Sequence, residues 1–397
     1  MRISPEKLAR VQKSLRDNGL DALFCRLSEH VLYLTGYWPH GQVGAAVFPA
    51  SGNPVLLIGE MEAQLEFNTF APASQVEVVT FPYESSEVMR GPVDVLAKAL
   101  PAVFQKLGLV GKVIGIEESF EGCNVGVFQG EVKYPNLPTW DMLKTTFPQN
   151  DFRDATSLIL KLRQIKSPEE VEAIRLAIET AAFGLQAARE AVHPGMKETE
   201  LAMVVESAIH TRGTGYNGIT QSRGYAAVNT GEHSATQWAH YANSTDRVIC
   251  DGDMVIIELG SFADGYWADL TRNIAVGKVD PKFSELYSAL CETQQAAYKA
   301  ARPGVPLNEL VRVARATLKK YGFVELWPHG LGHGVGFAYH EGPSVHIANP
   351  QPIEAGMVLT IEPGLYIPGL GGVRPEDMIL VHEDHVEVLS DSILRVL

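Results

Sequence analysis

Acidic residues lie inside or directly beside short apolar runs in the C-terminal half of the sequence, and their placement strongly constrains the fold. Glu258 interrupts the run from Met254 to Leu259, and Glu362 directly follows the run from Val358 to Ile361. A carboxylate cannot be buried in apolar surroundings without a partner. The fold must therefore bring a compensating group to these two acids.

Glu258 and Asp269 are eleven positions apart, and the stretch between them favours a turn. It contains Gly260, Asp264 and Gly265, and an Asp-Gly pair between apolar segments is typical of a β-hairpin. A hairpin would bring the two carboxylates together, where they repel unless a cation lies between them. The alternative is a purely structural pair of acids.

A histidine-rich segment, WPHGLGHGVGFAYHEGP, places His329, His333 and His340 among glycines, which let a backbone approach a ligand closely. One histidine alone is more often a structural hydrogen-bonding residue. Three in this short, glycine-rich segment favour a binding site.

A second pair of acids flanks a glycine-rich turn in GMVLTIEPGLYIPGLGGVRPEDMILV. Glu362 ends one apolar strand, Glu376 precedes another, and Arg374 lies two residues before Glu376. We expect the two glutamates to meet across a hairpin, with Glu362 buried. A single histidine among carboxylates suits manganese, iron, cobalt or zinc better than calcium.

The length of 397 residues predicts two domains, which we place at residues 1–160 and 161–397. Helical and strand patterns alternate in the first, which indicates an α/β layer structure. Ser167, Pro168 and Glu170 have the spacing of a helix start with a capping box. The predicted helices cover 5–18, 93–106, 281–301 and 307–321, and the predicted strands cover 22–25, 44–48, 54–58, 76–80, 113–116, 254–259, 358–361 and 378–382.

Composition excludes several partners. The formal net charge of -14 disfavours nucleic acid and anionic membranes, and no apolar run is long enough to span a bilayer. The four cysteines form no CxxC pair, which fits a reducing compartment and argues against a thiolate zinc site. We expect a cytoplasmic protein that acts on a small peptide or another small molecule.

The motifs together resemble the pita-bread metallohydrolase family of prolidase, aminopeptidase P, methionine aminopeptidase and creatinase. The segments from Asp264 to Arg272, His329 to Gly336, Thr360 to Gly364 and Val373 to Asp377 follow the family's order. The N-terminal segment LDALFCRLSEHVLYLTGY is similar to the domain that accompanies the two-domain members. The resemblance implies an N-terminal creatinase-like α/β domain, ribonuclease-H-like, and a C-terminal pita-bread α+β domain.

The resemblance also implies a two-metal centre and a set of site residues. Its five ligands fall on Glu258, Asp269, His333, Glu362 and Glu376, with Asp269 and Glu376 bridging two divalent ions, manganese first and cobalt, zinc or iron as options. Glu362 would take the proton of the attacking water. His340 would stabilise the oxyanion, His240 would position substrate, and His329 and Arg374 would line the site. The reaction implied is hydrolysis of an Xaa-Pro bond in a dipeptide or short peptide.

Position 258 departs from the family pattern, which has aspartate there in metal-dependent members. Glutamate is longer by one methylene, about 1.5 Å, whereas metal–ligand distances tolerate only about 0.2 Å. The backbone retreats, Glu258 binds differently, or one metal position is weakened. A metal-free, creatinase-like C–N hydrolase of a small amide, cyclic or amidino compound, with Glu258 as nucleophile or acid-base group, is the alternative function. A catalytically dead binding module is a third.

The family's two-domain members commonly form homodimers, and the resemblance implies the same here. Tyr37, Trp38 and Trp238 are candidates to restrict the pocket to small substrates, although ordinary core packing is the better explanation for each of them.

Overall fold

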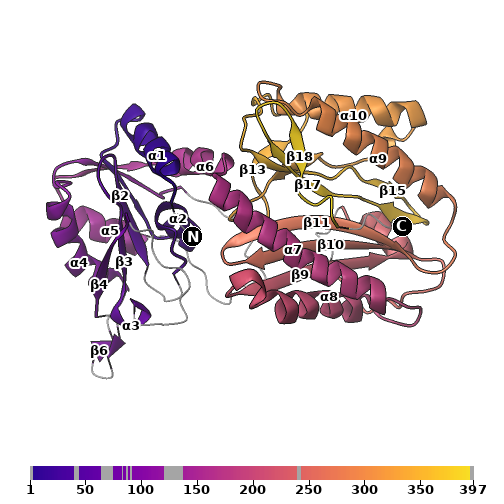
Figure 1. The fold of residues 1–397 in the computed structure, drawn as a ribbon, viewed down its shortest axis with the longest axis horizontal. Coiled ribbons are helices and arrows are strands. Elements are labelled where there is room, and N and C mark those ends of the chain that lie inside the picture. The colour runs from indigo at the N-terminus through magenta and orange to yellow at the C-terminus, as the bar shows by residue number, and fades with distance from the viewer. Residues whose placement is uncertain are drawn as a thin grey trace. The chain divides into compact units, whose positions relative to one another are not determined.

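The computed structural model describes residues 3–39, 44–63, 75–82, 84–85, 88–89, 92–119, 137–238 and 243–393. The chain divides into two compact units, Met1–Arg163 and Gln164–Leu397, each of which is considered by itself (Figure 1). Among the described residues, no helix combines the length and apolar character needed to cross a membrane.

The first unit is built on a mixed sheet with the strand order β4-β3-β2-β1-β7-β8. Parallel pairs β3/β4, β1/β7 and β7/β8 flank the antiparallel strands in the middle. Its strands are β1 (Ala22–Cys25), β2 (Ala45–Pro49), β3 (Val55–Gly59), β4 (Glu77–Phe81), β5 (Glu84–Ser85), β6 (Val88–Met89), β7 (Val113–Ile116) and β8 (Asp151–Asp154). Its helices are α1 (Pro5–Asp17), α2 (Ser28–Thr35), α3 (Glu60–Ala63), α4 (Pro92–Lys106), α5 (Leu137–Thr146) and α6 (Thr156–Gln164).

The second unit contains two antiparallel sheets, β11-β10-β9 and β13-β12-β14-β17-β18, and the hairpin β15-β16. Helices α7 and α8 pack against the first sheet, and α9 and α10 lie beside the second (Figure 1). The helices are α7 (Pro168–Ala191), α8 (Glu198–Gly213), α9 (Lys282–Ala300) and α10 (Leu307–Tyr321), with short 3-10 helices η1 (Tyr216–Gly218), η2 (Gly231–Thr236) and η3 (Val324–Leu326). The strands are β9 (Ser222–Thr230), β10 (Met254–Ala263), β11 (Tyr266–Ala275), β12 (Gly332–Gly334), β13 (Glu341–Val345), β14 (Val358–Ile361), β15 (Leu365–Ile367), β16 (Gly371–Val373), β17 (Asp377–Val381) and β18 (Val386–Val388).

Most of the predicted elements are confirmed. β1, β7, β14 and α10 have the predicted bounds, and the other predicted helices and strands, apart from β10, differ from the prediction by one residue at one or both ends. The capping box at the start of α7 is present, with the Ser167 backbone N–H donating to Glu170 Oε2 over 3.0 Å. Because a carboxylate near a helix N-terminus also complements the helix dipole, this start is well defined.

One predicted strand was too short. β10 continues past Leu259 to Ala263, since Gly260 stays in the ladder opposite Asp269 on one side and Tyr225 on the other. A glycine inside a strand often marks a place where another group approaches closely. Here the ring of Tyr339 approaches: a Cβ on Gly260 would lie 2.9 Å from Tyr339 Cε2.

Candidate metal centre

The hairpin of β10 and β11 carries the first pair of acids, as predicted. It closes at Asp264 and Gly265, whose φ angles of 47° and 95° suit a type I′ turn. The register places Glu258 opposite Thr271 and Gly260 opposite Asp269. Opposite residues share a face and so do every second residue along a strand, so Glu258 and Asp269 point to the same side of the hairpin.

The second pair of acids meets between β14 and β17. Ile361 pairs with Asp377, so Glu362, one residue later, lies next to Glu376, one residue earlier. Gln294 of α9 donates its Nε2 hydrogens to Ile361 O over 2.9 Å and to Pro375 O over 3.2 Å. This buried amide therefore fixes the two backbone positions that precede the acidic residues.

His333 lies on β12, between two glycines that allow close packing of the strands. A Cβ on Gly332 would lie 2.0 Å from Thr360 O, and one on Gly334 would lie 2.3 Å from Gly342 O. At these two positions the glycines thus make room for neighbouring backbone. The backbone N–H of His333 donates to Thr360 Oγ1 over 3.1 Å. This hydrogen bond fixes the position of His333 relative to β14.

The orientation of the His333 ring creates an unsatisfied lone pair. Nδ1 lies 2.9 Å from Gly334 O, an acceptor, so Nδ1 carries the proton and Nε2 is left with its lone pair. Nε2 faces Asp269 Oδ2 at 3.3 Å and Glu362 Oε1 at 3.5 Å. Three acceptor atoms facing one another repel, and a cation placed among them removes the repulsion.

Other atoms in the cluster also lack partners. Neither Asp269 oxygen, nor His333 Nε2, nor Glu376 Oε1 has a hydrogen-bond partner within the described part of the chain. Asp269 and Glu376 are completely buried, and ligand atoms of His333, Glu362 and Glu376 lie within 4.8 Å of one another. Buried polar atoms without partners are rare in proteins and need an explanation.

Electrostatics agree with this geometry. Burial, then the charges of Glu376 and Glu362, raise the pKa of Asp269 well above its usual value. Burial and the Glu376 charge do the same to the pKa of Glu362, whereas burial lowers the pKa of His333 to about 4. The protein alone thus disfavours three ionised carboxylates, and a divalent cation reverses that balance.

The other predicted histidines occupy three different situations. His340 Nε2 lies 3.7 Å from Asp269 Oδ2, its ring contacts that of His333 edge-on, and burial lowers its pKa to about 3. His329 Nε2 lies 3.2 Å from the hydroxyl of Tyr366, whose pKa is raised by burial and then by the charges of Glu362 and Glu376. His240 lies outside the described residues.

Glu258 has more partners within the protein than the other acids of the cluster, and it shares Thr271 with Glu376 and Arg374 with Glu362. Arg374 forms an ion pair with Glu258 Oε2, and the hydroxyl of Tyr339 donates to Oε1 over 2.5 Å. The hydroxyl of Thr271 lies 3.0 Å from Oε2 and 2.7 Å from Glu376 Oε2. Gln237 adds a longer contact to Oε2, at 3.4 Å. Both oxygens of Glu258 are therefore engaged within the protein.

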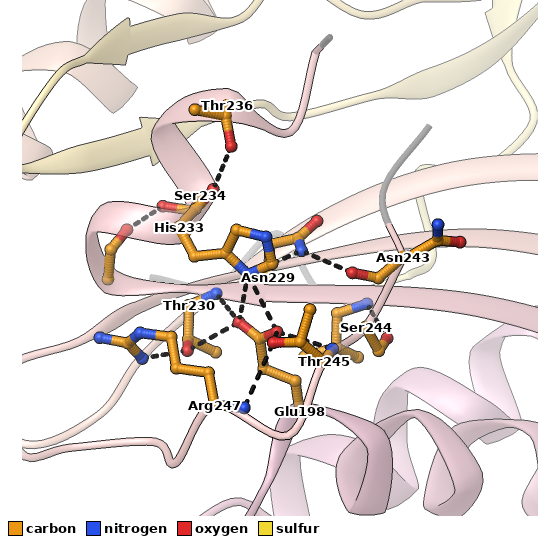
Figure 2. Close-up of polar contacts among 12 residues, drawn as sticks. Glu198, Asn229, Thr230, His233, Ser234, Thr236, Asn243, Ser244, Thr245 and Arg247 are labelled. Carbon is orange, nitrogen blue, oxygen red and sulfur yellow. Dashed lines mark hydrogen bonds and ion pairs between the residues drawn. The ribbon is translucent and has the colours of Figure 1, made fainter. Parts of the chain in front are cut away.

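Another carboxylate, that of the buried Glu198 at the start of α8, fixes the segments on either side of His240 (Figure 2). Oε1 accepts from Thr230 N over 2.8 Å, Oε2 accepts from Thr245 N over 3.0 Å, and His233 Nδ1 lies 3.0 Å from both oxygens. Thr230 ends β9 and His233 lies in η2. Because Gln237 directly follows η2, Glu198 also sets the position of a group that contacts Glu258.

Sequence reasoning missed Tyr339, Thr271 and Glu198. The available signal for Tyr339 was its position directly before His340, and Thr271 lies two residues after Asp269, on the same strand face. No sequence motif marked Glu198 as a functional residue. Of the aromatic candidates, Tyr37 is buried in the first unit and donates to Glu62 Oε1 over 3.0 Å, Trp38 is half-buried, and Trp238 is 44% exposed.

Comparisons with known proteins agree with this description. The model of metallopeptidase family M24 matches residues 172–383, and that of the creatinase/prolidase N-terminal domain matches residues 7–165. The chain is 31% identical to an Xaa-Pro dipeptidase of Pyrococcus furiosus over 387 residues, 98% of each chain.

Solved structures of similar proteins cover almost the whole chain. The prolidase from Pyrococcus furiosus has a TM-score of 0.71 at 29% identity and covers 96% of this chain and 99% of its own. An Xaa-Pro dipeptidase from Bacillus anthracis has a TM-score of 0.78 at 25% identity and covers 99% of both chains. The two-domain architecture is therefore shared along its full length.

Proposed function

This chain belongs to metallopeptidase family M24, and we propose that it hydrolyses Xaa-Pro dipeptides with the help of a divalent metal ion. The similarity to Xaa-Pro dipeptidases extends over nearly the whole chain, so it includes both the segments that carry the acids and the N-terminal domain. A substrate of this class also fits the formal net charge of -14, because nucleic-acid binding needs a basic surface.

One observation carries the metal-dependent part of the proposal. The lone pair of His333 Nε2 faces carboxylate oxygens of Asp269 and Glu362 at 3.3 and 3.5 Å. The donor set of Asp269, His333, Glu362 and Glu376 combines one imidazole with three carboxylates, which suits manganese, iron, cobalt or zinc. We propose manganese, because carboxylate oxygens dominate the set.

Different residues perform the separate steps of peptide hydrolysis. A divalent ion supplies Lewis acidity, which lowers the pKa of water toward neutrality. Glu362, whose side chain is 15% exposed, takes up the proton that water releases as it attacks the amide carbonyl, and later returns it to the leaving amine. His340 donates a hydrogen bond to the oxyanion that develops on the carbonyl. Its side chain is 29% exposed, which leaves it accessible to substrate.

Assembly and location are part of the proposal too. The resemblance to two-domain family members supports a homodimer. Cys25 and Cys250 are free thiols, which supports a reducing, cytoplasmic environment. Size-exclusion chromatography with light scattering tests the dimer.

Chelation followed by reconstitution tests the function. The protein is stripped with EDTA, dialysed and assayed on Ala-Pro, Leu-Pro and Met-Pro before and after Mn²⁺ is added. Leu-Ala tests the requirement for proline, and Leu-Pro-Gly separates a dipeptidase from an aminopeptidase. We expect no hydrolysis by the stripped protein and hydrolysis of the dipeptides after Mn²⁺ is restored.

Two other results would each contradict the proposed function. Failure of the Mn²⁺-loaded protein to cleave any Xaa-Pro substrate overturns the proposed function. Activity that survives exhaustive chelation supports instead the metal-free C–N hydrolase that uses Glu258. His385→Ala, at an exposed position, is the control for substitution of a histidine in the site, such as His333→Ala.

A further inference from the structure

We propose that the centre holds a single divalent ion, bound by Asp269, His333, Glu362 and Glu376, because Glu258, Tyr339 and Arg374 close the place of a second ion. The proposal rests on the proposed metal-dependent function and specifies how many ions that function uses. It departs from the two-metal centre that the resemblance implies.

Glu258 differs from its neighbours in the carboxylate cluster, although a ligand atom of Glu258 lies within 4.8 Å of ligand atoms of Asp269 and Glu376. Asp269, His333 and Glu376 have atoms without hydrogen-bond partners in the described part of the protein. By contrast, Glu258 Oε1 accepts from Tyr339 and Glu258 Oε2 pairs with Arg374. In the two-metal centre that the resemblance implies, the residue at position 258 would give both oxygens to one ion. Those oxygens already have donors and a neutralising charge.

Tyr339 packs into a space that is open because residue 260 is a glycine. Its ring lies over Gly260, where a Cβ would lie 2.9 Å from Cε2. Trp267 and His340 flank the ring at centroid distances of 6.0 and 4.3 Å. The hydroxyl is thereby directed at Glu258.

Arg374 supplies the charge that a second ion would bring. Its side chain is only 7% exposed, Nε donates to Thr271 Oγ1 over 3.2 Å, and its backbone N–H donates to Asn273 Oδ1 over 3.2 Å. A divalent ion placed beside this guanidinium would be repelled at short range. The extra methylene of Glu258 places its carboxylate next to these donors. The added length of about 1.5 Å exceeds the variation of about 0.2 Å that metal–ligand distances tolerate.

Counting ions on the wild-type protein tests the proposal directly. Metal-free protein is titrated with Mn²⁺, the free ion is followed by electron paramagnetic resonance, and the bound ion is measured by plasma mass spectrometry after gel filtration. We expect one tight equivalent per chain and the spectrum of an isolated Mn²⁺. Two tight equivalents with the spectrum of an exchange-coupled pair overturn the one-ion centre but leave the proposed function standing. No bound ion overturns both.

Two variants assign the ligands. Glu258→Gln keeps the size of the side chain and is expected to retain one equivalent with an affinity within about threefold of wild type, because Glu258 is not a ligand. Glu376→Gln is expected to weaken binding by more than about 100-fold, beyond the loss typical of residues that only support a ligand. Loss of the ion from Glu258→Gln, with a native circular dichroism spectrum, overturns the proposal.

Discussion

Each unit contains a buried cluster of titratable side chains, and the two differ in how their polar atoms are satisfied. In the first unit, ligand atoms of Cys25, His30 and Glu117 lie as close together as those of the acids in the second unit. His30 Nδ1, however, lies 2.5 Å from Glu117 Oε1, and His30 Nε2 accepts from Arg163 over 2.8 Å. Both ring nitrogens therefore have protein partners.

The second unit presents the opposite case. His333 uses one ring nitrogen on a backbone carbonyl and directs the other at acceptors. Proximity alone thus does not distinguish a metal site from a structural network. The distinction lies in unsatisfied lone pairs, because a metal needs those electrons and a completed hydrogen-bond network has already used them. Glu198, with donors on both oxygens, belongs with the structural networks (Figure 2).

Removing the two histidines should separate the two kinds of cluster. His333→Ala is expected to reduce Mn²⁺ affinity and Xaa-Pro hydrolysis by more than about 100-fold, because a direct ligand is lost. Its fold should remain intact, since Nε2 makes no hydrogen bond to any residue that the structure describes. Isothermal titration calorimetry and dipeptide assays measure both losses. Unchanged affinity would place the ion elsewhere.

His30→Ala should instead affect stability. The substitution leaves Glu117 and Arg163 without their shared partner in a buried site, which is expected to destabilise the first unit by about 3 kcal/mol. Urea unfolding followed by circular dichroism measures this change. Mn²⁺ stoichiometry should equal that of wild type. A lower stoichiometry in the folded variant would contradict the assignment of this cluster as structural.

Glu198→Ala tests positioning without metal binding. The change releases Thr230, His233 and Thr245 from their common acceptor and should lower kcat/KM about tenfold, or about 1.4 kcal/mol, through misplacement of the segment that carries Gln237. Glu198→Gln, which keeps one acceptor oxygen, should recover part of the loss. Metal stoichiometry is measured in parallel.

The control for Glu198 is Glu232→Gln, an exposed position in η2, which should match wild type in kcat and KM. A Glu198→Ala variant that lost its metal together with its activity would show that this carboxylate supports the ligands instead of the segment.

Tyr339→Phe should have the smallest effect. The ring still fills the space over Gly260, and Glu258 keeps its contacts with Arg374 and Thr271. We expect one Mn²⁺ per chain and a change in kcat of about threefold or less, because the ion pair with Arg374 still neutralises Glu258. A second equivalent of Mn²⁺ in this variant would show that the phenol alone excludes an ion.

Local signals in the sequence predicted much of the fold. Strict apolar runs identified β1, β7 and β14, the capping box identified the start of α7, and Asp264-Gly265 identified the hairpin that carries Glu258 and Asp269. These features depend on neighbours a few positions apart in the chain, which is the information that a sequence displays most clearly.

The hydrogen-bond partner of each buried polar group could not be predicted from such local patterns. Tyr339 and Glu258 are 81 positions apart, and His30 and Glu117 are 87 apart. Each contact depends on which face of which strand meets the other, and on the rotamer that fills the space. The same limit explains why Glu258 and Asp269 looked alike in the sequence but differ in the structure.

Binding of the ion at the unused lone pair of His333 can be observed by pulsed electron paramagnetic resonance of the Mn²⁺-loaded protein with ¹⁵N-labelled histidine, because a bound imidazole nitrogen couples to the electron spin. We expect coupling to one histidine nitrogen in wild type and in His30→Ala, and none in His333→Ala. Coupling that persists in His333→Ala, or disappears in His30→Ala, would show that the ion binds elsewhere.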